Sequence, residues 1–427
     1  MASPSGPPAD FYRDPAVIQD PHGYFAAVRP LGAAFVEPWH GSLMVTGHAL
    51  VEEILRRQEA FSAAVAVVGP IPPPPFAPAG DDIDAQLEAH RGELPWSAHL
   101  VTFDGNRHTE FRSLLARLLT PQRVRANEDY LRGLADRLID GFAARGRCEV
   151  MADYAHRATT YAISDLLGIP EEDRSQLLAL LGPPPSQIEG DAPHKVGPDP
   201  LAFLKPFFDH YLQERQAKPR DDLLSELLAA DLPGGRRPSL DEVSLLARFL
   251  FGAGQDTTAR LITMGLKILA EEPDLQERLR RQPERVGDFI EEVLRFEPPV
   301  KAIYRIARRT VEVGGVRISA GTVVALCLAA ANRDPARFPD PDRFDLERAD
   351  RDHLAFGKGR HACLGAPLGR LEARVAVERF LARLGPFRLD ETRHGPPQAR
   401  RFRFEPTYSF RSLAELHLEF APPEGAP

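Results

Sequence analysis

The chain has 427 residues, of which 43% are hydrophobic and 27% charged, and it carries a net charge of −8. This composition is ordinary for a globular protein, and the length allows either one large domain or two. The acidic balance argues against a nucleic-acid binder, because neutralising phosphates requires a basic surface. No apolar run approaches the ~18 residues of a membrane span, and no cationic segment followed by an apolar one opens the chain, so we expect neither a membrane anchor nor secretion.

Clusters of proline mark loops in the chain but do not separate it into domains. The sequence has 41 of them, clustered at 70–78, 183–185 and 193–200, where they predict loops. These clusters are too short to be linkers, and no repeat of fixed period is present. We therefore expect one domain over residues 14–420, with an N-terminal tail at 1–13 and a C-terminal tail at 421–427.

Between the loops, apolar residues recur at the spacing of a helix, for example from Leu131 to Phe142. The longest such pattern runs from about Leu240 to Ala270, and it opens with Ser239 followed three residues later by Glu242, the form of a capping box. At ~1.5 Å per residue, this helix could cross the whole molecule.

Strand patterns are short and local. Residues 311–313 and 316–318 flank a Gly-Gly turn, and 322–326 follow. The expected fold is mainly α-helical with small β-sheets.

Three cysteines, Cys148, Cys327 and Cys363, stand far apart. Their odd number and wide spacing offer neither a disulfide framework nor a CxxC zinc site, which predicts a protein of the reducing cytoplasm. Cys148 and Cys327 have the features of ordinary small core residues.

Cys363 differs, because it ends the segment Phe-Gly-Lys-Gly-Arg-His-Ala-Cys at 356–363. Gly357 and Gly359 permit positive φ and the close approach of a flat ligand, and a helix is predicted from about Leu364. A thiolate ahead of that helix would be stabilised by its N-terminus.

This segment resembles the heme-binding signature of the cytochrome P450 superfamily, in which the equivalent cysteine is the axial iron ligand. The resemblance runs from about Asp14 to Phe420 and is to the soluble bacterial branch. It implies heme b (iron protoporphyrin IX) between the long central helix and the cysteine loop. It also implies cofactor contacts from a set of residues in two motifs: Ala253, Gly254, Phe356, Gly357, His361 and Gly365.

The middle of the long helix carries a second motif, Ala-Gly-Gln-Asp-Thr-Thr at 253–258, whose glycine and adjacent threonines are poor helix formers. It resembles the family's oxygen-activation motif. The resemblance implies that Thr257, with Asp256 behind it, relays protons to bound oxygen.

A third motif pairs Glu292 with Arg295 on one helix face. On its own such a pair is a common surface feature, but it matches the ExxR motif of the family, and Arg343 matches the arginine that completes a buried ion cluster. These three residues are expected to be structural.

Four scattered cations are the expected partners of the heme propionates by their places in the family's motifs: His108, Arg112, Arg305 and His361. Arginine suits carboxylates because its guanidinium donates in a planar fork.

The resemblance implies a monooxygenase that uses O2 on an apolar small molecule. No GxGxxG nucleotide motif follows a strand, so electrons should come from a ferredoxin and its NAD(P)H-dependent reductase. A basic patch for that donor is expected from Arg112, Arg117, Lys358 and Arg360, and the protein is expected to be a monomer. A peroxide-driven or isomerising heme enzyme and a non-catalytic gas or redox sensor stay open as alternatives.

Substrate recognition is expected from the loops at 62–99, 181–208, 300–304 and 407–410, the first of which could serve as a lid. The candidate walls are the large apolar residues of these loops: Phe76, Trp96, Phe203, Phe207, Ile303 and Phe410. Lys301 is the one charge there that could select a carboxylate, although its stem could also carry it to solvent.

Overall fold

The computed structural model describes residues 8–181 and 196–422. Most of them form helices, which confirms the predicted class. The helices are α1 (Pro15–Gln19), α2 (Pro21–Val28), α3 (His48–Arg56), α4 (Asp84–His90), α5 (Gly105–Leu118), α6 (Pro121–Ala126), α7 (Glu128–Ala143), α8 (His156–Leu167), α9 (Glu171–Leu181), α10 (Lys205–Ala217), α11 (Leu223–Ala229), α12 (Leu240–Glu271), α13 (Pro273–Arg281), α14 (Val286–Phe296), α15 (Leu328–Ala331), α16 (Ala366–Arg383) and α17 (Glu391–His394).

The strands form three small sheets. The largest has the order β1-β2-β8-β5-β3, the second is β4-β10-β9, and the third is the hairpin β6-β7. The strands are β1 (Ala34–Val36), β2 (Leu43–Val45), β3 (Phe61–Ser62), β4 (Arg147–Glu149), β5 (Ile303–Ala307), β6 (Val311–Val313), β7 (Val316–Ile318), β8 (Val323–Leu326), β9 (Phe387–Leu389) and β10 (His417–Phe420).

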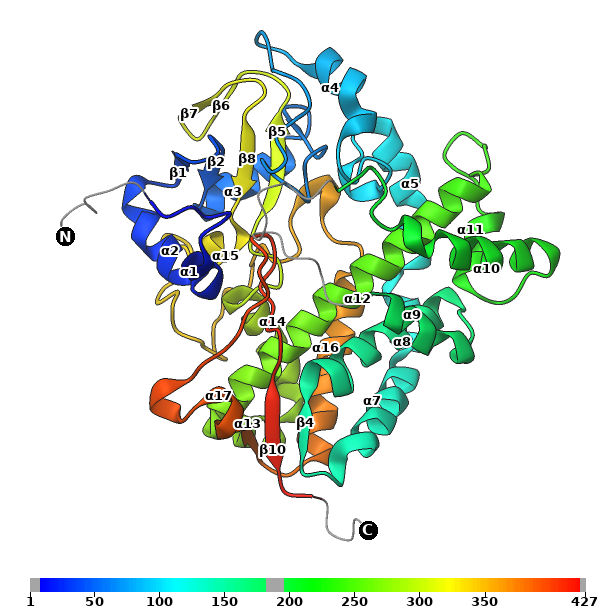
Figure 1. Ribbon diagram of the computed structural model, residues 1–427, viewed down its shortest axis with the longest axis vertical. Helices are drawn as coiled ribbons and strands as arrows, with labels where there is room; N and C mark the ends of the chain where they lie inside the picture. Colours follow the sequence, from blue (N-terminus) through cyan, green and yellow to red (C-terminus); the bar gives the residue numbers. More distant parts are fainter. Residues whose placement is uncertain (1–7, 182–195, 423–427) are drawn as a thin grey trace.

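The long predicted helix is α12, which runs diagonally through the helical part of the molecule (Figure 1). It begins as the sequence predicts, because the Ser239 side chain accepts from the Glu242 N–H and the Glu242 carboxylate accepts from the Ser239 N–H. It packs on α8, α10 and α16, so its middle is enclosed by other helices. This position makes α12 a fixed wall for whatever lies beside it.

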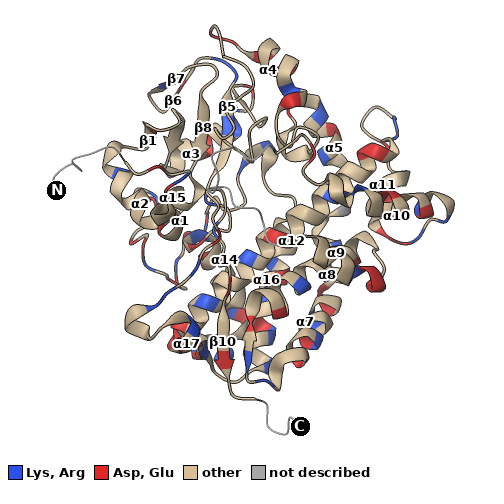
Figure 2. Cartoon of the chain, viewed as in Figure 1, with Lys and Arg blue, Asp and Glu red and all other residues tan. Residues whose placement is uncertain are grey.

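The predicted helix after Cys363 is α16, and it begins at Ala366 rather than near Leu364. Leu368, Leu371, Val375 and Phe380 are buried along it, as the apolar stripe predicts. Its polar face pairs with α7 through Arg379 and Asp136, among other ion pairs, and Figure 2 shows blue and red segments side by side on these two helices. Together these contacts hold α16 against the helical core and α7.

Two boundaries differ from the prediction. The N-terminal tail is shorter than 1–13, because Phe11 and Tyr12 are buried in the core beside the large sheet. The segment 300–304, predicted as a loop, leads into β5, which pairs with β8. The proline cluster at 183–185 and part of the predicted loop at 181–208 lie outside the described residues.

Within residues 8–181 and 196–422, no helix is both long enough and apolar enough to cross a bilayer.

Candidate functional site

A cavity of about 310 Å³ lies between the middle of α12 and the cysteine segment. The cysteine segment contributes Phe356, Gly357, His361, Cys363 and Gly365 to its wall. The two motifs that are more than a hundred residues apart in the sequence therefore face the same space, as the sequence predicts.

Glycines shape the cysteine segment. Gly357 and Gly359 have φ of +65° and +70°, where residues with a side chain are strained. At Gly359 a Cβ atom would also lie 2.7 Å from the Leu55 carbonyl oxygen. The Cys363 N–H donates to the Phe356 oxygen at 2.9 Å, which closes the loop and fixes the direction of the thiol.

The Cys363 thiol is exposed to the cavity, whereas Cys148 and Cys327 are buried, as predicted. Burial within the surrounding chain raises the pKa of Cys363, while hydrogen bonds from the N–H groups of Gly365 and Ala366 and the charge of Arg112 oppose that rise. These donors are the N-terminal N–H groups of α16, which favour a negatively charged sulfur. The site thus presents one cysteine that can act as an anionic ligand.

Helix α12 forms the opposite wall with Ala253, Gly254, Thr257 and Thr258. The Thr257 hydroxyl donates to the Ala253 carbonyl oxygen at 3.0 Å. Gly254 allows α8 to approach, because a Cβ there would lie 3.3 Å from Ile163. Helix α12 therefore brings a hydroxyl, that of Thr257, to the same cavity as Cys363.

The four predicted cations also meet at this cavity: His108, Arg112, Arg305 and His361 all line it. The His108 and His361 rings lie with centroids 3.9 Å apart. Burial and the neighbouring arginines lower the pKa of His108 to about 4, and burial lowers that of Arg305 to about 10. The His108 Nδ1 atom is buried without a hydrogen-bond partner. No acidic side chain of the described residues lines the cavity, so no carboxylate pairs with these groups inside it.

A family model described as Cytochrome P450 matches residues 198–402. A putative cytochrome P450 140 of Mycobacterium bovis is 34% identical over 382 residues, which are 87% of this chain and 84% of that protein. The chain belongs to the cytochrome P450 family.

One further relative and one solved structure support this membership. A vitamin D(3) 25-hydroxylase of Pseudonocardia autotrophica is 36% identical over 298 residues, which are 69% of this chain and 73% of that protein. The structure of Mycobacterium marinum cytochrome P450 CYP150A6 in the substrate-free form matches with a TM-score of 0.90 and 44% identity, over 97% of this chain and 99% of that chain. This chain is thus a cytochrome P450 monooxygenase of bacterial type.

The cofactor of this family is heme b, and the cavity of this P450 fits it. The fit rests on chemistry that the structure shows: a thiol on one wall, and four uncompensated cationic or imidazole groups where two carboxylates would supply the missing charge. The buried unpartnered His108 Nδ1 atom is satisfied if a propionate or its water lies beside it.

Asp256, predicted to stand behind Thr257, does not line the cavity itself. Its Oδ2 atom accepts from Nε and Nη2 of Arg260 at 3.0 and 2.7 Å. Arg260 is buried and also donates to Glu405 at 2.6 Å. Asp256 and Thr257 are adjacent on α12, yet only Thr257 reaches the cavity. The pairing of Arg260 with Glu405 could not be predicted from local patterns, because the two residues are 145 positions apart.

The predicted ion cluster forms, with one member exchanged. Glu292 and Arg295 are buried and joined by two hydrogen bonds of 2.7 and 2.8 Å. Arg343 was expected to complete the cluster, but its side chain is 67% exposed and pairs with Asp345. The third partner is instead the buried Arg348, whose Nε lies 3.3 Å from Glu292.

The exchange has a simple geometric reason. Arg343 contributes its backbone carbonyl, which accepts from Arg295 at 3.0 Å and from Arg348 at 3.2 Å, so its side chain points outward. A turn at 339–345 determines which arginine faces inward, and a sequence motif alone does not reveal that turn.

Most predicted substrate walls are wrong. Ile303 lines the cavity, but the other five do not. Phe76 stacks on His90, Phe203 is largely exposed, and Phe410 lies under the Arg260 guanidinium. Trp96 and Phe207 pack against the helical core. The apolar walls of the cavity come from several elements and include Ala66, Leu100, Val101, Phe249, Leu250 and Val300.

Lys301 is also placed differently from both expectations. It is buried, and its ammonium donates to the Thr407 carbonyl oxygen at 2.8 Å. Burial lowers its pKa well below the ordinary value. It neither lines the cavity nor reaches solvent, so it cannot select a substrate carboxylate.

Two of the four residues of the predicted basic patch are engaged in contacts within the protein. Arg112 turns inward and donates to the Ala362 oxygen at 2.6 Å, and Lys358 pairs with Asp352. Arg117 and Arg360 remain exposed.

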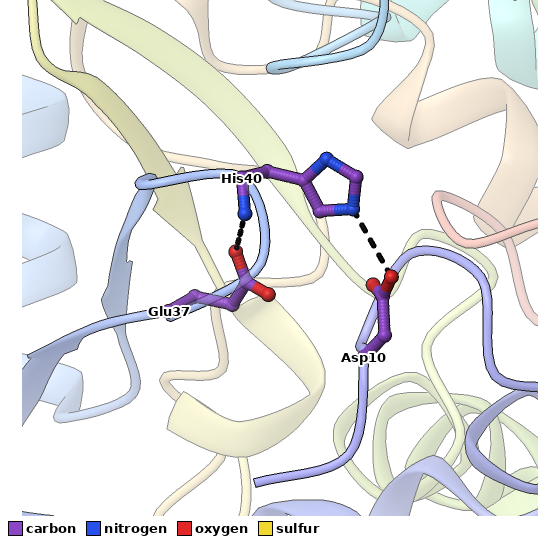
Figure 3. A group of neighbouring side chains, drawn as sticks. All are labelled: Asp10, Glu37 and His40. Atoms are coloured by element: carbon purple, nitrogen blue, oxygen red, sulfur yellow. Dashed lines mark hydrogen bonds and ion pairs between the residues drawn. The ribbon is translucent and has the colours of Figure 1, made fainter. Parts of the chain in front are cut away.

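A group of potential metal-binding side chains lies away from the cavity, at Asp10, Glu37 and His40 (Figure 3). The Glu37 carboxylate already accepts from the N–H groups of Trp39 and His40 at 2.9 and 2.7 Å. His40 Nε2 lies 3.1 Å from Asp10. These bonds account for the group as an anchor of the N-terminal segment.

Proposed function

We propose that this P450 inserts one oxygen atom of O2 into an apolar small molecule, by C–H hydroxylation or epoxidation. The observation that carries the proposal is the placement of Thr257 across the cavity from Cys363, with mainly apolar residues around the remaining wall. The similarity to a protein named vitamin D(3) 25-hydroxylase supports hydroxylation as the reaction class.

Heme with a thiolate ligand supplies reductive O2 activation, since the sulfur pushes electron density that favours O–O cleavage. Cys363 holds the iron on this proposal, and the N–H groups at the start of α16 stabilise its negative charge. His108, Arg112, Arg305 and His361 bind the two propionates.

Thr257 is the proposed proton donor of the site, at its Oγ1 atom. Its hydroxyl donates to Ala253 at 3.0 Å, so it can accept a hydrogen bond from water while it is held in place. Asp256 reaches this hydroxyl only through water or a change of rotamer, because Arg260 holds one of its oxygens. The mainly apolar walls exclude bulk water from the site.

Electrons come from a ferredoxin and its NAD(P)H-dependent reductase on this proposal. The groove between α6, α14 and α16 has an apolar floor bordered by Arg125, Arg370 and Arg374, and Glu291 also lines it. Arg370 pairs with Glu291, and Arg374 pairs with Glu128 and Glu378. The exposed Arg117 and Arg360 are therefore the side chains that support docking of an acidic redox protein. We further infer a monomer in the cytoplasm, in accord with three free cysteines.

The alternatives are a peroxide-driven or isomerising enzyme and a gas or redox sensor. None of these needs a proton donor for reductive O2 cleavage, so the cavity position of Thr257 favours the monooxygenase.

The test is a panel of terpenes, steroids, fatty acids and macrocycles, screened by the absorbance change on displacement of heme-bound water. The best binder is then turned over with ferredoxin, reductase and isotopically labelled O2. One labelled oxygen in the product is expected. Unlabelled product, or product formed only with added peroxide, would contradict the proposal.

A further inference from the structure

Three charged or polar side chains form a compact network beside the cavity: His99, Asp199 and Arg248. His99 Nε2 lies 2.9 Å from Asp199 Oδ1, and Arg248 Nη1 lies 2.7 Å from Asp199 Oδ2. The side chains of His99 and Arg248 are 0% and 1% exposed, whereas that of Asp199 is 25% exposed. The carboxylate thus meets solvent on one side and two buried partners on the other.

The network joins three separate parts of the chain. His99 ends the loop that leads to α5, Asp199 lies before α10, and Arg248 is on α12. The first two parts are also linked through their backbones, since Trp96 N–H donates to the Gly197 oxygen at 3.1 Å and Ala98 N–H to the Pro198 oxygen at 3.2 Å. Asp199 is therefore the shared counter-charge of two loops and a helix.

The same residues stand directly behind the cavity wall. Leu100 and Val101 follow His99, Phe249 follows Arg248, and all three line the cavity. The His99 and Phe249 rings have centroids 5.9 Å apart. The network consequently spans the layer of protein between solvent and the substrate space.

Two local features of this closed arrangement are energetically unfavourable. Trp96 has φ of +63°, a left-handed conformation that is an outlier for a bulky residue. His99 Nδ1 is buried without a partner, and because Nε2 must carry the proton given to Asp199, Nδ1 is an unsatisfied acceptor. Opening to water would give Nδ1 a hydrogen-bond donor and would free the backbone of Trp96 to leave this conformation.

We propose that Asp199 is a latch: its bonds to His99 and Arg248 hold two loops and α12 together over a route into the cavity, and their release lets substrate pass. This proposal rests on the proposed use of the cavity for an apolar substrate. Asp199 does not touch the reacting groups, so it controls rates of access rather than chemistry.

The test uses the heme-loaded protein and azoles that bind the iron, which report access without turnover. Association and dissociation of 4-phenylimidazole and of the smaller imidazole are followed by stopped-flow absorbance for the natural protein and Asp199→Asn. Asparagine keeps the size of the side chain but leaves Arg248 without its counter-charge. Asp209→Asn is the matched control, because Asp209 has a similarly exposed side chain, 26%, and accepts from Ser244 on the same α12.

Asp199→Asn is expected to raise both rate constants of 4-phenylimidazole about tenfold while Kd stays within about twofold, with a smaller change for imidazole and none in Asp209→Asn. Amide hydrogen exchange of residues 94–102 should accelerate in the same variant. Faster exchange with unchanged azole rates would overturn the latch and leave Asp199 a structural residue. Loss of azole binding in the natural protein would instead contradict the heme site itself.

Discussion

Thr257 is the residue whose role depends most on a single atom. We predict that Thr257→Ala retains heme and substrate binding but diverts electrons to peroxide. Product formation should fall about 10²-fold, the lower end of what a positioned proton donor contributes. The measurement is the ratio of product to NAD(P)H consumed, together with peroxide released.

Two matched variants make this prediction specific. Thr257→Ser keeps the hydroxyl and should restore most of the coupling. Thr263→Ala removes a hydroxyl with the same back-bond to α12, since Thr263 donates to Ala259 at 2.8 Å, but Thr263 does not line the cavity. Equal uncoupling in Thr263→Ala and Thr257→Ala would show that the effect comes from the helix and not from the cavity hydroxyl.

A second prediction at the residue scale follows from the finding that Arg348, and not Arg343, pairs with Glu292. Arg348→Met removes a buried partner of Glu292 and should lower the free energy of unfolding by about 2–4 kcal/mol. Arg343→Met should change it by no more than about 0.5 kcal/mol, because that side chain is mostly exposed. Denaturant unfolding of both heme-loaded variants is the measurement, and similar losses in the two would return Arg343 to the cluster.

At the scale of elements, the sequence predicts the helices and loops whose structure depends on neighbouring residues. The capping box and apolar spacing located α12, and the glycines with the cysteine located the loop before α16. Strands β1, β2 and β5 were missed, because runs of three to five residues acquire their meaning only from pairing across distant segments. The partners of Asp256 were missed for the same reason.

The residues that line the cavity are the feature that the sequence predicts least well. Large aromatic residues in loops were natural candidates, but Phe76 and Phe410 are used to pack against His90 and Arg260. The cavity is instead lined by other apolar residues, such as Leu100, Phe249 and Leu250. Only the tertiary arrangement determines which of these faces inward.

The latch also leads to a prediction on pH. Burial lowers the pKa of His99 from its ordinary 6.5, although Asp199 opposes that effect and Arg248 adds to it. A histidine with a depressed pKa in the closed state stabilises closure above about 6.5, and this contribution is lost as pH falls below that value. The pKa of Asp199 is also lowered, so the carboxylate would lose its negative charge only in more acid solution.

Only the unprotonated ring nitrogen of an azole can bind iron, so the rates are expressed per concentration of neutral azole. These corrected association rates should rise as pH falls from about 7.5 to 5.5. In His99→Gln, which cannot gain a proton, the rates should be flat across this window. A rise of the same size in His99→Gln would assign the pH effect to another group.

At the scale of the whole molecule, the electron donor must find one face of an acidic protein. Arg360 is exposed beside the cysteine segment. Reversing its charge in Arg360→Glu should slow reduction by a ferredoxin about fivefold at low salt and much less at high salt, since screening weakens such steering. Arg237→Glu is the control, as Arg237 is also exposed but lies before α12. Equal slowing in both variants, or no dependence on salt, would contradict docking at this face.

We infer that residues 11–420 act as one folding unit, because α12 and α16 contact most of the helical part and the N-terminal Phe11 and Tyr12 pack against the large sheet. On this account the whole arrangement brings Cys363 and Thr257 to the walls of one cavity, where Cys363 would hold a heme and Thr257 would supply a hydroxyl.

The most direct test is the absorbance spectrum of the reduced carbon monoxide complex, recorded for the natural protein and for Cys363→Ala. The natural protein should give the long-wavelength band of thiolate-ligated heme, and Cys363→Ala should lose it, while Cys327→Ala, at a buried cysteine outside the cavity, should keep it. A thiolate-type band that persisted in Cys363→Ala would contradict the assignment of the iron ligand and the account built on it.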